Sequence, residues 1–165
     1  MSSGAPRDRA SSYAIGVILM VAVTFLLAVL VLLMMVNLPY QYDPSVPAIF
    51  KIINIKHEPK WDSYMVVENT GTTGYSNLNL YAMTYRNGKL LSSSIATMNG
   101  HAFIPTHHYG VQTFGGPGSR KRVWDPNERV FIDFKDGTFH PGDVVTFEVY
   151  DVVTRQLISR HTYTA

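Results

Sequence analysis

An uninterrupted apolar segment from Tyr13 to Val36 constrains this chain more than any other feature. A helix over this segment would be about 36 Å long, enough to cross a hydrocarbon layer of about 30 Å. No Asp, Glu, Lys or Arg lies between Ser11 and Tyr42, so a helix in this segment would bring no charged side chain into lipid. Pro39 disfavours helix at the residue before it, so we expect the helix to end near Val36.

The segment is apolar on every side, and its small residues follow no small-xxx-small spacing that would mark a dimer face. Such a helix is buried all round, either in lipid or among other apolar helices, and the sequence leaves both environments open. If copies of the helix pack together, the expected core residues are Ile15, Gly16, Ile18, Leu19, Val21, Phe25, Leu26, Leu30 and Leu33.

A short polar stretch with Arg7 and Arg9 precedes the apolar segment. Positively charged flanks stay on the cytoplasmic side, so the leader is expected inside and the rest of the chain outside. A secretory signal has a shorter apolar stretch, of about 7 to 15 residues, and a small-x-small cleavage site, which Asn37-Leu38-Pro39 does not provide. We therefore divide the chain into a leader (1–10), an apolar helix (11–38), a Pro-rich connector (39–47) and a head (48–165).

From Ala48 the apolar period becomes about two, which predicts an α+β protein with an antiparallel β-sandwich-like head after the helix. Asn87-Gly88 predicts a two-residue hairpin. No helical pattern follows the connector. The sequence assigns no element between Met98 and Pro126, and within this region the Gly-rich piece Phe114–Ser119, with Arg120–Arg122 after it, is expected to be a long surface loop. The predicted strands are Ile49–Ile55, Tyr64–Glu68, Leu80–Arg86, Leu90–Thr97, Val130–Lys135, Val144–Asp151 and Leu157–Thr164.

Composition argues against several function classes. A net charge of +2 with scattered basic residues gives no nucleic-acid footprint. The chain has no Cys, so it has no disulfide and no thiolate metal site. The histidines His101, His107 and His108 lack a ligand spacing and are expected on the surface or in loops. Glu148 is expected on the polar face of a strand, no catalytic triad can be assigned, and we expect no enzyme, cofactor or metal.

The basic triplet Arg120, Lys121 and Arg122 leaves two alternatives open. Three adjacent cations in a loop are most often solvated charge. They could also meet an acidic surface, such as a glycan, a lipid head group or a neighbouring subunit. The triplet is therefore a possible surface contact loop.

The residues Ala10–Thr24 resemble the N-terminal segment of archaeal type IV pilins, whose pattern is a small residue followed by roughly Val-Ser-Pro-Val-Ile-Gly-Val-Ile-Leu-Met-Val-Ala. The match is closest over Ile15–Ala22, and the chain differs at Tyr13 and Ala14, where the family has Pro and Val. Ile15 stands where bacterial pilins place Glu, which fits the archaeal type.

The resemblance implies that a membrane prepilin peptidase cuts between Ala10 and Ser11, after which mature helices bundle into a filament core with β heads outside. The expected function is that of a structural subunit of a pilus-like surface filament, serving adhesion or surface attachment. Its expected partners are identical subunits, the membrane before assembly, the peptidase and the pilus assembly machinery.

The alternative is a permanently anchored single-pass protein whose extracellular β head binds a ligand or a surface partner. Such an anchor needs no peptidase site. Burial of an apolar helix against neighbouring helices removes a large area from water at about 25 cal/mol per Å², so in a filament the helix would carry assembly. Open head-to-tail contacts that do not close into a ring give helical filaments.

Overall fold

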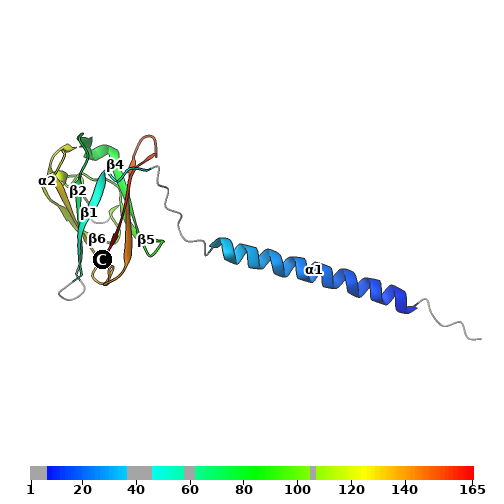
Figure 1. Ribbon diagram of the computed structural model, residues 1–165. Helices are drawn as coiled ribbons and strands as arrows, with labels where there is room; N and C mark the ends of the chain where they lie inside the picture. Colours follow the sequence, from blue (N-terminus) through cyan, green and yellow to red (C-terminus); the bar gives the residue numbers. More distant parts are fainter. Residues whose placement is uncertain (1–6, 37–45, 58–61, 105–106) are drawn as a thin grey trace, which may run out of the picture. The chain divides into compact units, whose positions relative to one another are not determined.

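The computed structural model of the chain describes residues 7–36, 46–57, 62–104 and 107–165 (Figure 1). It consists of an N-terminal apolar helix followed by antiparallel β sheets, which confirms the α+β class. The chain divides into two compact units, Met1–Gln41 and Tyr42–Ala165, and each is described by itself. Of the expected leader and connector, residues 1–6 and 39–45 lie outside the described ranges.

Helix α1 spans Arg7–Val36. It ends where Pro39 predicts, and it begins before the apolar segment because the Arg and Ala residues there are also good helix formers. Ala10 and Ser11, the expected cleavage residues, therefore lie within the helical backbone. The hydroxyl of Thr24 donates to backbone carbonyl oxygens of the preceding turn at 2.8 and 3.0 Å, so this polar group needs no partner outside the helix.

The head is the second unit, Tyr42–Ala165, and it is built almost entirely of strands. Its elements in chain order are β1 (Phe50–Lys56), β2 (Ser63–Asn69), β3 (Tyr75–Ser76), the 3₁₀ helix η1 (Asn77–Asn79), β4 (Leu80–Arg86), β5 (Lys89–Ile95), β6 (Val111–Gly115), the short helix α2 (Pro117–Arg120), β7 (Val123–Trp124), β8 (Arg129–Phe134), β9 (Val144–Asp151) and β10 (Leu157–Thr164).

These strands form two four-stranded antiparallel sheets. Sheet I has the order β1-β2-β8-β6 and sheet II the order β10-β9-β4-β5, while β3 and β7 pair as a small ribbon. Alternate residues of each sheet point into one shared core, which contains Met65, Ile132 and Phe134 from sheet I and Leu80 and Phe147 from sheet II. The head is therefore a sandwich with a single hydrophobic core.

Side chains of β10 join the two sheets along one side of the sandwich. The hydroxyl oxygen of Ser159 accepts hydrogen bonds from the backbone N–H groups of Ile49 and Phe50, both at 2.9 Å. The Nδ1 atom of His161 accepts from the N–H of Ile52 at 3.1 Å. These bonds satisfy N–H groups on the free edge of β1, which would otherwise be open to pairing with another strand.

The regular strands agree with the sequence-based prediction. β4, β9 and β10 have the predicted bounds, and β1, β2, β5 and β8 differ from them by one or two residues at their ends. The Asn87-Gly88 hairpin is confirmed, with φ angles of 51° and 76°. Both angles are positive, as a two-residue turn of this kind requires.

The prediction of a long surface loop for the Gly-rich piece and the basic residues after it is wrong, because the end of β6 and helix α2 lie there. The wider region from Met98 to Pro126, for which the sequence predicts no element, also contains β7 and buries Met98, His108 and Trp124. The expectation of no helix after the connector fails for the same region, since α2 follows Gly116, and for η1. These four elements have two to five residues each, so they show no periodicity and are held by tertiary contacts instead.

Candidate assembly surfaces

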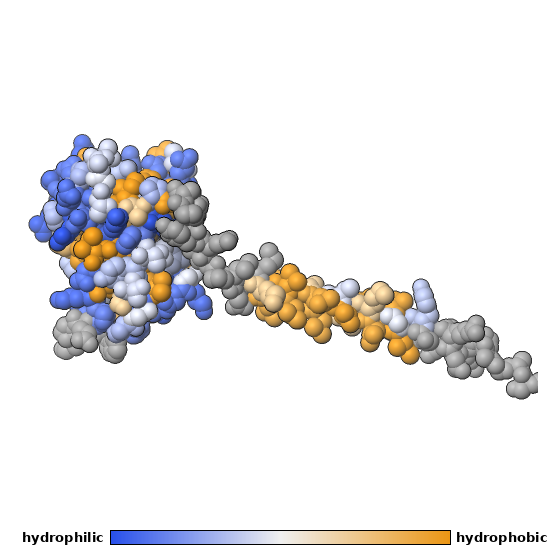
Figure 2. All heavy atoms as spheres, in the orientation of Figure 1, coloured by the Kyte–Doolittle hydropathy of each residue, from blue (hydrophilic) through white to orange (hydrophobic). Residues whose placement is uncertain are grey.

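Helix α1 exposes every side chain described between Tyr13 and Met34. Phe25 is 73% exposed and Leu26 is 63% exposed, values that a soluble protein does not leave on a long apolar helix. Figure 2 shows hydrophobic residues along most of α1, with a few more polar ones between them. The expected core residues Ile15, Gly16, Ile18, Leu19, Val21, Phe25, Leu26, Leu30 and Leu33 all belong to this surface, and which of them meet neighbouring helices stays a prediction.

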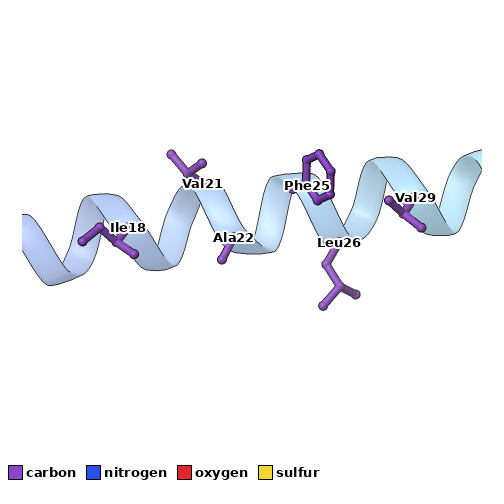
Figure 3. Close-up of a pocket in the computed structure, with 6 residues that line it drawn as sticks. All are labelled: Ile18, Val21, Ala22, Phe25, Leu26 and Val29. Carbon is purple, nitrogen blue, oxygen red and sulfur yellow. The ribbon is translucent and has the colours of Figure 1, made fainter.

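One stripe of this helix forms a shallow groove (Figure 3). The groove is centred on the small residue Ala22, and its spacing of three and four residues keeps its members on one side of the helix. Grooves of this kind receive the side-chain ridge of a second helix. The lining residues are Ile18, Val21, Ala22, Phe25, Leu26 and Val29.

The energetic consequence of this exposure is large. Full burial of one side chain such as Leu26 is worth about 1.5–3 kcal/mol relative to water. Helix α1 gains none of this burial energy within its own unit, because no part of its apolar segment Tyr13–Met34 is buried. The helix is therefore suited to lipid, to a bundle of other apolar helices, or to each in succession.

The basic turn, defined as Arg120, Lys121 and Arg122, is rigidly anchored through its backbone. The side-chain amide of Asn77 donates to the carbonyl oxygen of Gly118 at 2.7 Å and to that of Lys121 at 2.9 Å. The backbone N–H of Asn77 donates to the carbonyl oxygen of Arg122 at 2.9 Å. The turn is thus fixed by a residue distant in sequence. The prediction of a surface loop did not foresee this anchor.

The three cations of the basic turn are all exposed, but they differ in their partners. Lys121 Nζ lies 2.6 Å from Glu128 Oε1 and 3.5 Å from a carboxylate oxygen of Asp125, and the Glu128 contact raises the pKa of Lys121. No carboxylate in the described part of the chain lies within 4.0 Å of Arg120 or Arg122. Two guanidinium groups therefore remain available to an external anion.

The histidines do not form a metal site in the described residues, where no group of three metal-binding side chains occurs. His101 and His107 are exposed as expected, and the imidazole Nε2 of His101 lies 2.6 Å from the carbonyl oxygen of Arg120. His108 lies in a loop, which the prediction allowed, but it is buried rather than on the surface: it is 1% exposed and packs against the ring of Phe103. Phe103 in turn packs against the hydrophobic core of the head.

Glu148 is a second residue whose environment the sequence does not predict. It is fully buried on the outer face of sheet II, where Arg160 Nε lies 2.7 Å from its Oε1 atom. The hydroxyl of Tyr150 donates to the other carboxylate oxygen. Burial and this hydrogen bond to Glu148 raise the pKa of Tyr150. The neighbouring Tyr81 stacks on Tyr150 with ring centroids 5.0 Å apart, so aromatic rings cover part of this face.

No protein-family model and no curated protein sequence matches the chain. The archaellum periplasmic stator protein FlaG from Sulfolobus acidocaldarius is 13% identical, with a TM-score of 0.41, covering 70% of this chain and 97% of that chain. The archaellum periplasmic stator protein complex FlaF and FlaG from the same organism is 14% identical, with a TM-score of 0.42, covering 76% and 97%. At these TM-scores the likeness carries no argument about family or function.

Proposed function

We propose that the chain is a structural subunit of a surface filament of the archaeal type IV pilus kind, with copies of α1 packed in the filament core. The observation that supports this proposal is the surface of α1, which is apolar on every side and unburied within its own unit. The pilin-like residues Ala10–Thr24 add the second support. The head then acts as the displayed part, serving adhesion or surface attachment rather than catalysis.

The proposal gives α1 two successive environments. The precursor is held in the membrane by the charge-free window Tyr13–Met34, which at about 1.5 Å per residue spans about 33 Å. After removal of the leader, the same side chains contact neighbouring helices. The hydroxyl of Thr24 bonds within its own helix, so it is compatible with both environments.

Leader processing gives the first test. A cut between Ala10 and Ser11 would give a mature chain that begins at Ser11. Mass spectrometry of surface material should therefore find no Met1 terminus. An intact Met1 in assembled or surface-exposed chains would contradict processing and would favour the permanently anchored alternative, in which the head binds a ligand or a surface partner.

A charge within α1 gives the second test. Val21→Asp should abolish filaments seen by electron microscopy, because the carboxylate would be buried among apolar helices. The matched control is Val153→Asp in the head, where the side chain is 80% exposed and filaments should form normally. Membrane fractionation must show that the Val21→Asp chain still enters the membrane. Normal filaments from Val21→Asp would refute the role of α1 in the core.

A further inference from the structure

The two ends of sheet I carry different charges. The basic turn lies near the start of β8, since the indole N–H of Trp124 on β7 donates to the carbonyl oxygen of Glu128, just before Arg129. At the opposite end, Ser63 pairs with Phe134. This register brings Asp62, the residue before β2, to the end of the sheet where β8 finishes.

Three carboxylates meet at this second end, which we call the acidic end: Asp62, Asp133 and Asp136. The pKa of Asp133 is raised, chiefly by burial and also by the negative charges of Asp62 and Asp136, while a hydrogen bond from Thr113 opposes the shift. Lys56 and Lys135 also lie at this end, but neither is within 4.0 Å of a carboxylate among the described residues. Among the described residues, these three carboxylates therefore have no directly paired cation.

The basic turn presents the complementary charge in a fixed form. Asn77 holds its backbone, and Lys121 is directed to Glu128, which leaves Arg120 and Arg122 free of carboxylate partners within the described part of the chain. A guanidinium group matches a carboxylate in shape and can donate two parallel hydrogen bonds. Because the backbone is already ordered, binding an anion requires little further loss of freedom.

We propose that Arg120 and Arg122 of one copy bind the acidic end, Asp62, Asp133 and Asp136, of a second copy. The contact joins different surfaces of two identical heads, so it leaves one basic turn and one acidic end open and can continue from head to head. β8 has six residues, so the two charged ends are separated by about 20 Å along sheet I.

This contact rests on the proposed function, which would hold many heads close together. Exposed ion pairs are weak and screened by salt, so the charged ends of isolated heads in dilute solution would seldom meet. Tethering through packed helices raises the effective concentration of one head near the next. The inference therefore identifies the partner of the basic turn as another subunit, rather than a glycan or a lipid head group.

Cysteine crosslinking of the full chain in assembled material tests the contact, because the native chain has no Cys. Val123→Cys places a thiol beside Arg122, and Lys135→Cys places one between Asp133 and Asp136. With both substitutions in one chain, oxidation should give a ladder of species larger than dimers on a non-reducing gel. Either substitution alone can give a dimer at most.

Charge reversal then tests the cause of the ladder. Adding Arg120→Glu and Arg122→Glu should reduce species larger than dimers by about tenfold or more, because like charges would face each other. Adding Asp62→Arg and Asp136→Arg to that chain should restore the ladder. The matched control, Lys89→Glu on β5 with Arg155→Glu in the turn between β9 and β10, should leave it unchanged.

Two outcomes would overturn the inference: filaments that form with no ladder in the double-cysteine chain, or a ladder that persists after reversal of Arg120 and Arg122. Both leave the proposed function intact, since filaments are present. An absence of filaments from the unmodified chain would instead contradict the proposed function itself.

Discussion

Two ion pairs in the head have nearly the same geometry in different surroundings. In sheet I, Arg129 Nε lies 2.6 Å from Glu68 Oε2, and the two side chains are 53% and 18% exposed. In sheet II, Arg160 Nε lies 2.7 Å from Glu148 Oε1, and the exposed fractions are 9% and 0%. In both cases the arginine directly faces its glutamate across an antiparallel ladder.

The comparison shows that distance alone does not set the energetic weight of an ion pair. Water and salt screen the pair in sheet I, and such exposed pairs contribute about 0–1 kcal/mol. Removing one partner of a buried pair leaves an uncompensated charge and costs about 3–5 kcal/mol. The outer faces of the two sheets therefore differ in kind: that of sheet I is solvated, and that of sheet II contains a buried polar network.

The largest effect is expected from breaking the buried pair. Arg160→Ala should lower the free energy of unfolding by about 3–5 kcal/mol, because Glu148 would remain buried without its counter-charge. Urea titration of the full chain in detergent micelles, followed by tryptophan fluorescence, measures this because Trp124 is buried in the head. A loss below about 1 kcal/mol would show that the pair behaves like an exposed one.

A smaller effect is expected from removing one hydrogen-bond donor to the same carboxylate. Tyr150→Phe should cost about 1.5 kcal/mol, the lower end for a bond to a charged group, since the ring is only half-buried.

The same variant should also change how the stability of the head depends on alkaline pH. The folded state raises the pKa of Tyr150 above its ordinary value of 10.0 through burial and the bond to Glu148. This contribution to stability is complete below pH 10 and is lost as the pH rises above it. Unfolding measured from pH 8 to 11 should therefore show a flatter alkaline decline for Tyr150→Phe, and identical slopes would contradict the assignment.

The exposed pair gives the matched comparison. Arg129→Ala should change the free energy of unfolding by at most about 1 kcal/mol, and added salt should reduce the difference from the unmodified chain. The same urea titration measures both quantities. A loss as large as that of Arg160→Ala would mean that burial is not what distinguishes the two pairs.

The smallest effect is expected at His161, which bonds to Ile52 through neutral Nδ1. Burial, and secondarily the charge of Lys51, lowers the pKa of His161 in the folded state. Its contribution to stability is therefore present above the ordinary value of 6.5 and is lost as the pH falls below it. His161→Asn keeps an acceptor near the same position without titrating, so its stability should fall less between pH 7 and 5. Parallel profiles for both chains would contradict this role.

The sequence predicts the regular part of the head well. In β9, Val145, Phe147 and Val149 alternate with polar residues, and this period of two places them in the core. The same alternation places Glu148 on the outer face correctly. It does not predict that Glu148 is buried there, because its partner Arg160 and the ring of Tyr81, which stacks on Tyr150, belong to other strands.

The candidate surfaces, too, could be predicted from the sequence only in part. The segment from Met98 to Pro126 contains no periodic pattern, so neither its short elements nor the rigidity of the basic turn can be predicted from it. The backbone of the basic turn is held by Asn77, which lies 41 residues before Gly118 in the sequence. Gly118 packs so closely on Trp124 that a Cβ would lie 2.6 Å from the indole nitrogen. Such contacts leave no local signal in the sequence.

The sequence by itself determined that the chain contains a charge-free apolar segment, Tyr13–Met34, which requires an apolar environment, and that a β head follows it. The reason is that apolar length and periodicity depend on residues close together in the chain. Only the tertiary structure decided which polar groups are buried, which cations have no carboxylate partner among the described residues, and where the two charged ends of sheet I lie. These properties depend on strand order and register, which bring distant residues together.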